Sequence, residues 1–176
     1  MEAAIITGCI TMIGWIVSYY LTKQKENSTK RLQLQIEYVS RQIEEFYGPV
    51  FSLINQLDMY YITKTKIVDN SGIASNDKVR IDVFVRESYF YQLHSEIRHL
   101  IKTKFHLLEE SELPDSYKLY LQHSIQETLQ IEIWNKLNIN TVCVKGLEWP
   151  NEFDKHIERE LNSLKAKYDM LINKLR

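Results

Sequence analysis

The chain begins with a long apolar segment that differs from everything after it. Between Ala3 and Thr22 no side chain is charged, and isoleucine is the commonest residue. About 20 helical residues at about 1.5 Å each reach about 30 Å, the thickness of the hydrocarbon core of a bilayer. Tyr19 and Tyr20 come just before Lys23, where aromatic rings favour the level of the lipid headgroups. The pattern predicts a single membrane-spanning helix over residues 1–22.

Two other kinds of segment compete with this interpretation. A cleaved signal peptide needs basic residues before its apolar core and small residues at its cleavage site. Here the only early charge is Glu2, and the bulky Tyr19 and Tyr20 occupy the end of the segment. A buried core helix usually has an apolar stretch of about 10–14 residues, which is shorter than this one. We therefore favour a membrane anchor.

Positive charge follows the expected span. A polar collar over residues 23–31 contains Lys23, Lys25, Lys30 and Arg31, and no basic residue precedes the span. Lys and Arg that flank a span on one side favour the cytoplasmic side of the membrane. We expect the protein to lie in a bacterial inner membrane, with its N-terminus outside and a cytoplasmic domain over residues 32–176.

Small and hydroxyl side chains recur along one face of the span. They are Ala4, Thr7, Thr11, Gly14 and Ser18, with Gly8 beside them. Small residues let helices approach closely in lipid, and hydroxyl groups can form hydrogen bonds across the contact. The stripe predicts self-association, with a weakly polar pore lining and a chance pattern as alternatives. Because no ionisable residue lies within the span, a charged selectivity ring is not supported.

Beyond the collar, a second apolar pattern repeats with spacings of four and three residues. Its members are Leu32, Ile36, Val39, Ile43, Phe46, Val50, Leu53, Leu57 and Tyr60. This spacing predicts a helix with one apolar stripe that packs on other helices. Gly48-Pro49 lies inside the pattern, and proline lacks the amide donor that a helix interior needs. We expect a kink there, because the stripe keeps its phase.

The rest of the chain predicts three further helices, over roughly residues 77–108, 116–137 and 150–175. Asp77 would cap the first of them, although the alternating stretch Val79–Val85 would also suit a strand. Leu121, Ile125 and Leu129 would form the buried stripe of the second, and Pro150 would be the first residue of the last. We therefore expect an all-α protein, with a body of four to five helices behind the anchor.

Composition and charge exclude several other classes of protein. The 176 residues include 22 Lys and Arg against 23 Asp and Glu, so bulk electrostatics do not favour a protein that coats nucleic acid. Five glycines and three prolines are too few for a turn-rich β architecture. Two cysteines, Cys9 and Cys143, cannot form a disulfide framework.

Enzyme signatures are missing from the sequence. It has no glycine-rich phosphate loop, no Gly-x-Ser-x-Gly motif and no Cys or His cluster at zinc spacing. Glu96 and His99 form one Glu-x-x-His, a motif that di-metal helix bundles use twice together with two further glutamates. Nothing in the sequence places a base beside Cys143. We expect no catalytic residue, no metal and no cofactor.

A group of cationic side chains gives the strongest indication of a ligand. His94, Arg98, His99, Lys102 and Lys104 occur close together, and no acidic residue lies between positions 97 and 108. With the neighbouring aromatic residues they could hold phosphates and stack a base, as in a site for a nucleotide or a short oligonucleotide. The competing interpretation is that cations favour the C-terminal end of a helix and are neutralised by the acids of residues 109–115.

Two stretches resemble segments of known bacterial proteins that combine an N-terminal anchor with a helical body. They are Arg41-Gln42-Ile43-Glu44-Glu45-Phe46-Tyr47-Gly48-Pro49 and the stretch from Trp149 to Lys165 with its stripe of apolar residues. In layout, the chain also resembles the small membrane effectors of bacterial anti-phage systems, among them the channel-forming effector of the Hailong system. This resemblance implies a homo-oligomer whose cytosolic helices sense a nucleotide-derived signal and open a pore.

The sequence thus supports two hypotheses of function. The first is an oligomeric, ligand-gated pore or membrane effector in anti-phage defence, with membrane lipid, further copies of the chain (a tetramer is one arrangement) and a nucleotide or short oligonucleotide as partners. The second is a membrane-tethered helical scaffold or binding module with no transport activity.

Overall fold

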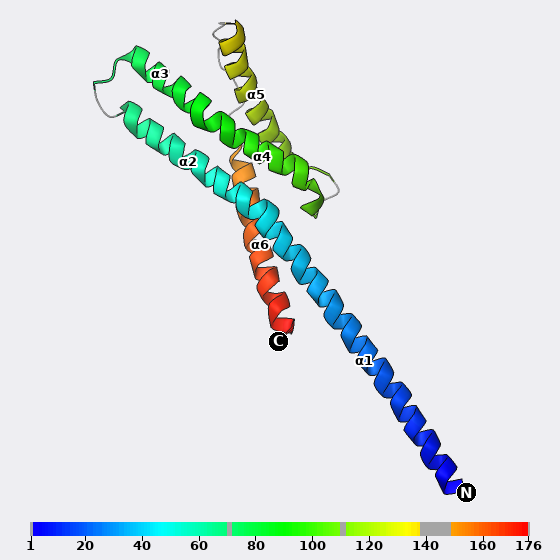
Figure 1. The fold of residues 1–176 in the computed structure, drawn as a ribbon. Coiled ribbons are helices and arrows are strands. Elements are labelled where there is room, and N and C mark those ends of the chain that lie inside the picture. The colour runs from blue at the N-terminus through cyan, green and yellow to red at the C-terminus, as the bar shows by residue number, and fades with distance from the viewer. Residues whose placement is uncertain (1, 70–71, 110–111, 138–148, 176) are drawn as a thin grey trace. The chain divides into compact units, whose positions relative to one another are not determined.

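In the computed structural model, every regular element of the described residues is a helix (Figure 1). The structure describes the backbone of residues 2–69, 72–109, 112–137 and 149–175, and it describes side chains from residue 14 onward within these ranges. The elements are α1 (Glu2–Gln42), the π-helical turn η1 (Ile43–Tyr47), α2 (Gly48–Asp69), α3 (Ser75–Val85), the π-helical turn η2 (Arg86–Phe90), α4 (Tyr91–Lys104), the 3₁₀ turn η3 (Phe105–Leu107), α5 (Asp115–Leu137) and α6 (Asn151–Leu175). The predicted all-α class is confirmed.

The chain divides into two compact units. Residues 1–40 and 166–176 form the first unit, and residues 41–165 form the second, which we call the helical body. Helix α1 is 41 residues long and has no break, so the expected span and the polar collar are parts of one helix. Cys143 lies outside the described residues.

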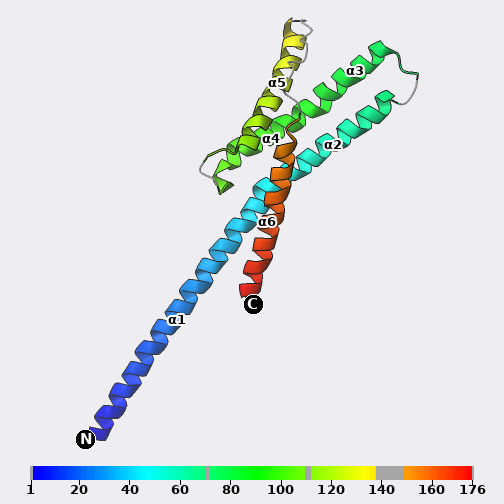
Figure 2. The same ribbon diagram turned by 180° about the vertical axis from the view of Figure 1, so that it is seen from behind.

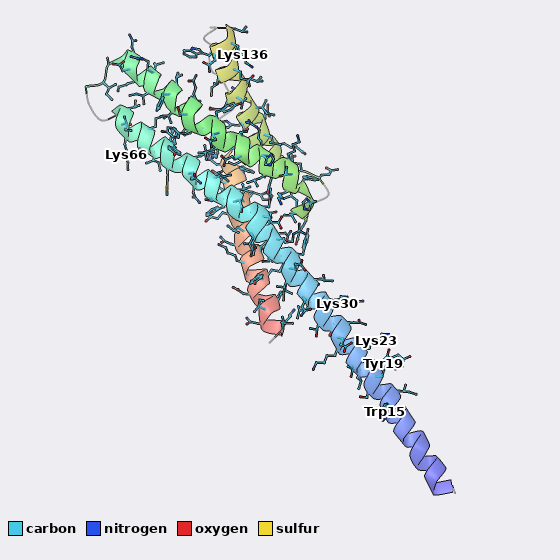
Figure 3. All side chains as sticks on the ribbon, viewed as in Figure 1. Trp15, Tyr19, Lys23, Lys30, Lys66 and Lys136 are labelled. Atoms are coloured by element: carbon cyan, nitrogen blue, oxygen red, sulfur yellow. The ribbon has the colours of Figure 1, made fainter. Side chains whose placement is uncertain are left out.

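In the first unit, the apolar side chains at the N-terminal end of the described part of α1 are exposed, whereas Val39 near its C-terminal end is buried. Trp15 is 78% exposed, and Ile16 and Val17 are each 51% exposed. Figure 3 shows Trp15, Tyr19, Lys23 and Lys30 along this helix, and the Lys23 ammonium lies 5.6 Å from the centre of the Tyr19 ring.

Among the side chains that the structure describes, no helix has a stretch that is both long and apolar enough to cross a membrane. Residues 3–13 of the expected span lie outside those side chains, and so do Ala4, Thr7, Gly8 and Thr11 of its predicted stripe.

The helical body is built on a hairpin of helices. Helix α2 packs antiparallel against α3 and α4, and the two arms lie side by side in both views (Figures 1 and 2). The apolar stripes of the two arms are buried, with Leu53, Ile54 and Leu57 on α2 and Leu93 and Ile97 on α4. The predicted helix over residues 77–108 is confirmed as four consecutive helical elements, α3, η2, α4 and η3.

The predicted cap of this helix is wrong by one turn. The capping position is Ala74, and the Asp77 amide donates to the Ala74 carbonyl oxygen at 2.9 Å. Asp77 therefore belongs to the first turn, where a carboxylate suits the positive end of the helix dipole.

The interruption expected at Gly48-Pro49 takes the form of a π-helical turn and does not break the helix. The Gly48 amide donates to the Ile43 carbonyl oxygen, five residues earlier. The wide turn accommodates the missing amide donor of Pro49. It also brings the backbone so close that a Cβ at Gly48 would lie 2.7 Å from the Ile43 carbonyl oxygen, so only glycine fits without a local shift.

Helix α5 has the predicted extent within one residue, but the predicted buried face is wrong. Its buried residues are Tyr117, Tyr120 and Ser124, whereas Ile125 and Leu129 are 49% and 50% exposed. The rings of Tyr117 and Tyr120 pack against Phe153 of α6, with centres 5.1 and 4.2 Å away. Large aromatic faces and a small serine therefore decide which side of α5 faces inward, and the aliphatic stripe is left outside.

Helix α6 confirms its predicted stripe. Within the helical body, Phe153, Ile157, Leu161 and Leu164 are all buried. The helix begins at Asn151, one residue after the predicted first residue, Pro150. The carbonyl oxygen of Pro150 accepts a hydrogen bond from the Phe153 amide at 2.8 Å.

Candidate functional site

His94, the first residue of the predicted cationic group, lies inside the helical body. Its side chain is 3% exposed, and Nδ1 is hydrogen-bonded to the Tyr120 hydroxyl oxygen at 2.9 Å. Burial lowers the pKa of His94 to about 3, and the charges of His123, Arg98 and Arg86 add to this effect. The imidazole is therefore neutral near pH 7 and contributes no positive charge.

Arg98 and Lys104 form contacts between elements of the helical body. Arg98 Nη1 donates to the backbone carbonyl oxygen of Ser124 at 3.1 Å, to the Ser124 hydroxyl at 2.6 Å and to the Thr128 hydroxyl at 3.0 Å. Lys104 Nζ donates to Glu45 Oε2 at 2.6 Å. The two cations thus join α4 to α5 and to η1.

Glu45 is held between two cations. Arg41 Nε donates to its Oε1 at 2.9 Å, and Lys104 binds the other oxygen. The hydrogen bonds from Arg41 and Lys104 lower the pKa of Glu45 to about 2. The Glu45 carboxylate is thus ionised over the physiological pH range, and it neutralises the charge of the Lys104 ammonium.

His99 and Lys102 are exposed on α4. His99 lines an open hollow that includes Pro49, Leu53 and Glu96. The five predicted residues consequently do not share one surface: His94 and Arg98 face α5, Lys104 faces η1, and the other two face solvent.

A cavity of about 520 Å³ lies among α2, η2, α4, α5 and the start of α6. This volume falls in the usual range of pockets for small ligands. Its lining comes from several elements of the helical body: Leu57, Asp58, Tyr61, Lys64, Arg86, Phe90, His94, His123, Gln126, Glu127, Gln130, Trp149 and Asn151.

Aromatic rings form one wall of this cavity. The centres of the His123 and Trp149 rings are 5.4 Å apart with the rings nearly perpendicular, and the His94 ring lies 6.0 Å from Trp149. The centres of the Tyr120 and Trp149 rings are 6.0 Å apart, and these two rings are also nearly perpendicular. In the sequence Trp149 stands out only by a resemblance, and no local pattern connects it with His94 or His123.

A network of ion pairs forms another wall. Asp82 accepts hydrogen bonds from Lys64 Nζ at 2.5 Å and from Arg86 Nε at 2.8 Å, and Arg86 Nη1 donates to Glu127 Oε1 at 2.5 Å. Burial works against the charge of Arg86, but the carboxylates of Glu127 and Asp82 prevail and raise its pKa. Burial likewise opposes the ionisation of Asp82, and hydrogen bonds from Lys64 and Arg86 still lower its pKa.

Two further carboxyl groups lie at or near the aromatic wall. Asp58 lines the cavity, and Trp149 Nε1 donates to Asp154 Oδ2 at 2.5 Å. The other oxygen of Asp154 is buried without a hydrogen-bond partner among the described residues. Burial raises the pKa of Asp154 to about 6, and the charge of Asp58 adds to this, while the Trp149 hydrogen bond opposes it.

In the part of the chain that the structure describes, no group of three or more His, Cys, Asp or Glu side chains is placed to bind a metal ion. Glu96 of the single Glu-x-x-His motif accepts a hydrogen bond from Gln92 at 3.1 Å. The cavity is lined instead by aromatic rings, side-chain amides and carboxylates, which suit the binding of a small organic ligand.

Comparison with known protein families, curated proteins and solved structures finds no match to this chain.

Proposed function

We propose that this protein is an oligomeric single-pass membrane effector whose helical body senses a ligand. The observation that carries the proposal is the exposed apolar face of α1, where Trp15, Ile16 and Val17 continue an uncharged sequence that begins at Ala3. Fully burying one such side chain is worth about 1.5–3 kcal/mol. A bilayer would provide this burial along the whole segment.

The border of the uncharged segment supports the same placement. Tyr19 and Tyr20 are exposed on α1, and Lys23 follows one turn later with its ammonium near the Tyr19 ring. Aromatic rings followed by lysine are typical of the membrane–water interface on the cytoplasmic side. The helical body would accordingly lie in the cytoplasm.

Self-association through α1 would complete the effector. Gly14 has no atom within 4 Å of a Cβ built on it, and Ser18 is exposed, so the described part of the small-residue stripe is open to a second helix. One helix cannot enclose a water path, and a pore therefore requires several copies, for which a tetramer is one arrangement. The resemblance in layout to anti-phage membrane effectors favours a gated pore.

A tethered scaffold is the second candidate, and one observation favours it. Ile125 and Leu129 expose an aliphatic stripe on α5 of the helical body. Such a stripe could dock a protein partner without any change in the membrane segment. Replacing residues 3–22 by an unrelated polyleucine span separates the two functions, because a tether would survive the exchange and a gated pore would not.

The membrane placement is tested by extraction of membranes with alkaline carbonate. The unchanged protein is expected to stay in the membrane pellet. The double variant Ile16→Arg/Val17→Arg should move largely to the supernatant, because each arginine costs about 2.5–3.5 kcal/mol at the centre of a span and less towards its ends.

The matched control is Leu34→Arg/Tyr38→Arg, which changes two exposed positions of the same helix beyond the collar. It is expected to stay in the pellet. Release of the unchanged protein by carbonate, or equal release of both variants, would contradict the proposal.

A further inference from the structure

The positive charges of the cavity are already neutralised by the protein. Lys64 and Arg86 are its lysine and arginine, and both are hydrogen-bonded to Asp82, while Arg86 also binds Glu127. A phosphate that entered the cavity would have to displace these carboxylates or lie beside them. The cavity is therefore a poor site for an anionic ligand.

Negative charge near the aromatic wall lacks such compensation. No ion pair joins Asp58 or Asp154 to a cation among the described residues, and Asp154 Oδ1 has no hydrogen-bond donor. The repulsion between Asp58 and Asp154 contributes to the raised pKa of Asp154. A cation at the wall would relieve this repulsion and would favour the ionised form of Asp154.

The aromatic wall suits a cation that carries an aromatic ring. An indole ring is the best aromatic partner for a positive charge, and Trp149 lines the cavity together with His123, whose ring is nearly perpendicular to it. The Gln130 side-chain nitrogen is buried without a hydrogen-bond partner among the described residues, so it can donate to a polar atom of a ligand. A volume of about 520 Å³ leaves room for an aromatic body as well as an amine.

We propose that this cavity binds a small organic cation of the arylalkylamine class, with its ammonium between Asp58 and the face of Trp149 and its ring against the aromatic wall. The inference deepens the proposed sensing role and rests on it for its biological use. It replaces the anionic ligand that the sequence predicts with a ligand of the opposite charge.

Three indoles with short side chains of different charge test the proposal by isothermal titration calorimetry of the full chain in detergent micelles. Tryptamine carries a cation, tryptophol is neutral and indole-3-acetate is an anion. Tryptamine is expected to bind about tenfold more tightly than tryptophol, and indole-3-acetate more weakly than either. Binding of none of the three, or binding of indole-3-acetate or AMP as tightly as tryptamine, would overturn the proposal.

The role of Asp58 is tested with Asp58→Asn, an exposed position where the change should not disturb folding. This variant is expected to lose most of the tenfold preference for tryptamine over tryptophol while its affinity for tryptophol stays within twofold. Asp69→Asn removes the same charge from an exposed position on the same helix, and it should keep the preference. An unchanged preference in Asp58→Asn would refute the assignment of the ammonium.

The two proposals fail separately. The double variant Ile16→Arg/Val17→Arg is expected to bind tryptamine like the unchanged protein in micelles, because these positions belong to α1 and not to the cavity. Loss of membrane insertion with intact binding would leave this inference standing. Firm membrane insertion without a preference for tryptamine would remove this inference alone.

Discussion

The core of the helical body and the described N-terminal part of α1 contain the same apolar residue types but differ in how far they bury them. In the body, Ile97, Phe153 and Ile157 are buried completely, whereas Ile16 and Val17 of α1 are half exposed. The body therefore supplies an apolar environment for these three residues, whereas the described residues leave Ile16 and Val17 half open. The comparison teaches that burial depends on the tertiary neighbours of a residue rather than on its type.

The largest effect expected from this comparison concerns the core. Phe153→Ala should lower the free energy of unfolding by about 3–5 kcal/mol, because it empties a buried site between Tyr117 and Tyr120. Ile16→Ala should change it by less than about 0.5 kcal/mol. Denaturation of both variants in detergent, followed by circular dichroism, measures the difference. Similar losses in the two variants would mean that α1 also forms part of a folded core.

A pH titration sharpens the comparison, because the buried His94 is a feature of the body. Its folded pKa is lowered from 6.5 to about 3, so its stabilising contribution is complete above pH 6.5 and is lost as the pH falls towards 3. Lowering the pH from 7 to 5 should lower the free energy of unfolding by about 2 kcal/mol. Each of the 1.5 pH units between 6.5 and 5 contributes about 1.36 kcal/mol to this loss.

The variant His94→Gln should lose this part of the pH dependence, as measured by urea denaturation at the two pH values. His99→Gln is the matched control, an exposed histidine on the same helix, and it should keep the dependence of the unchanged protein. An identical slope in His94→Gln and the unchanged protein would show that the buried imidazole does not titrate in this way.

The smallest effect separates two helical glycines. Gly48→Ala should cost about 1 kcal/mol, because crowding of the Ile43 carbonyl costs about 1–3 kcal/mol and the better helix propensity of alanine returns about 0.5–1 kcal/mol. Gly14→Ala meets no atom within 4 Å and should be neutral or slightly stabilising. Thermal melts of the two variants provide the test, and a stabilised Gly48→Ala would show that the π-helical turn relaxes without cost.

Most of the fold could be predicted from apolar spacing, because several helices of the body bury an apolar stripe. The stripes through Phe46 and Val50 and through Phe153 and Ile157 follow this rule. Helix α5 does not, because its inner face is made of two tyrosines and a serine, and the hydroxyls of Tyr120 and Ser124 are hydrogen-bonded to α4. The spacing of aliphatic residues therefore predicts burial of the face of α5 that is in fact exposed.

The candidate cavity could not be predicted from the sequence. Its ion pairs join residues far apart in the chain, since 41 residues separate Arg86 from Glu127 and 18 separate Lys64 from Asp82. The cationic group from His94 to Lys104 was visible as a pattern, but a pattern does not show that Arg98 and Lys104 already have acceptors. Charge compensation between helices is a tertiary property.

The aliphatic stripe of α5 has a consequence for handling the protein. Ile125, Leu129 and Leu137 leave a ridge of hydrocarbon in contact with water. The tendency of such a ridge to leave water weakens on cooling, because its driving force near room temperature is mainly entropic. Two molecules that meet along this ridge are thus held less firmly in the cold, and stock solutions are expected to stay more dispersed when chilled than when warmed.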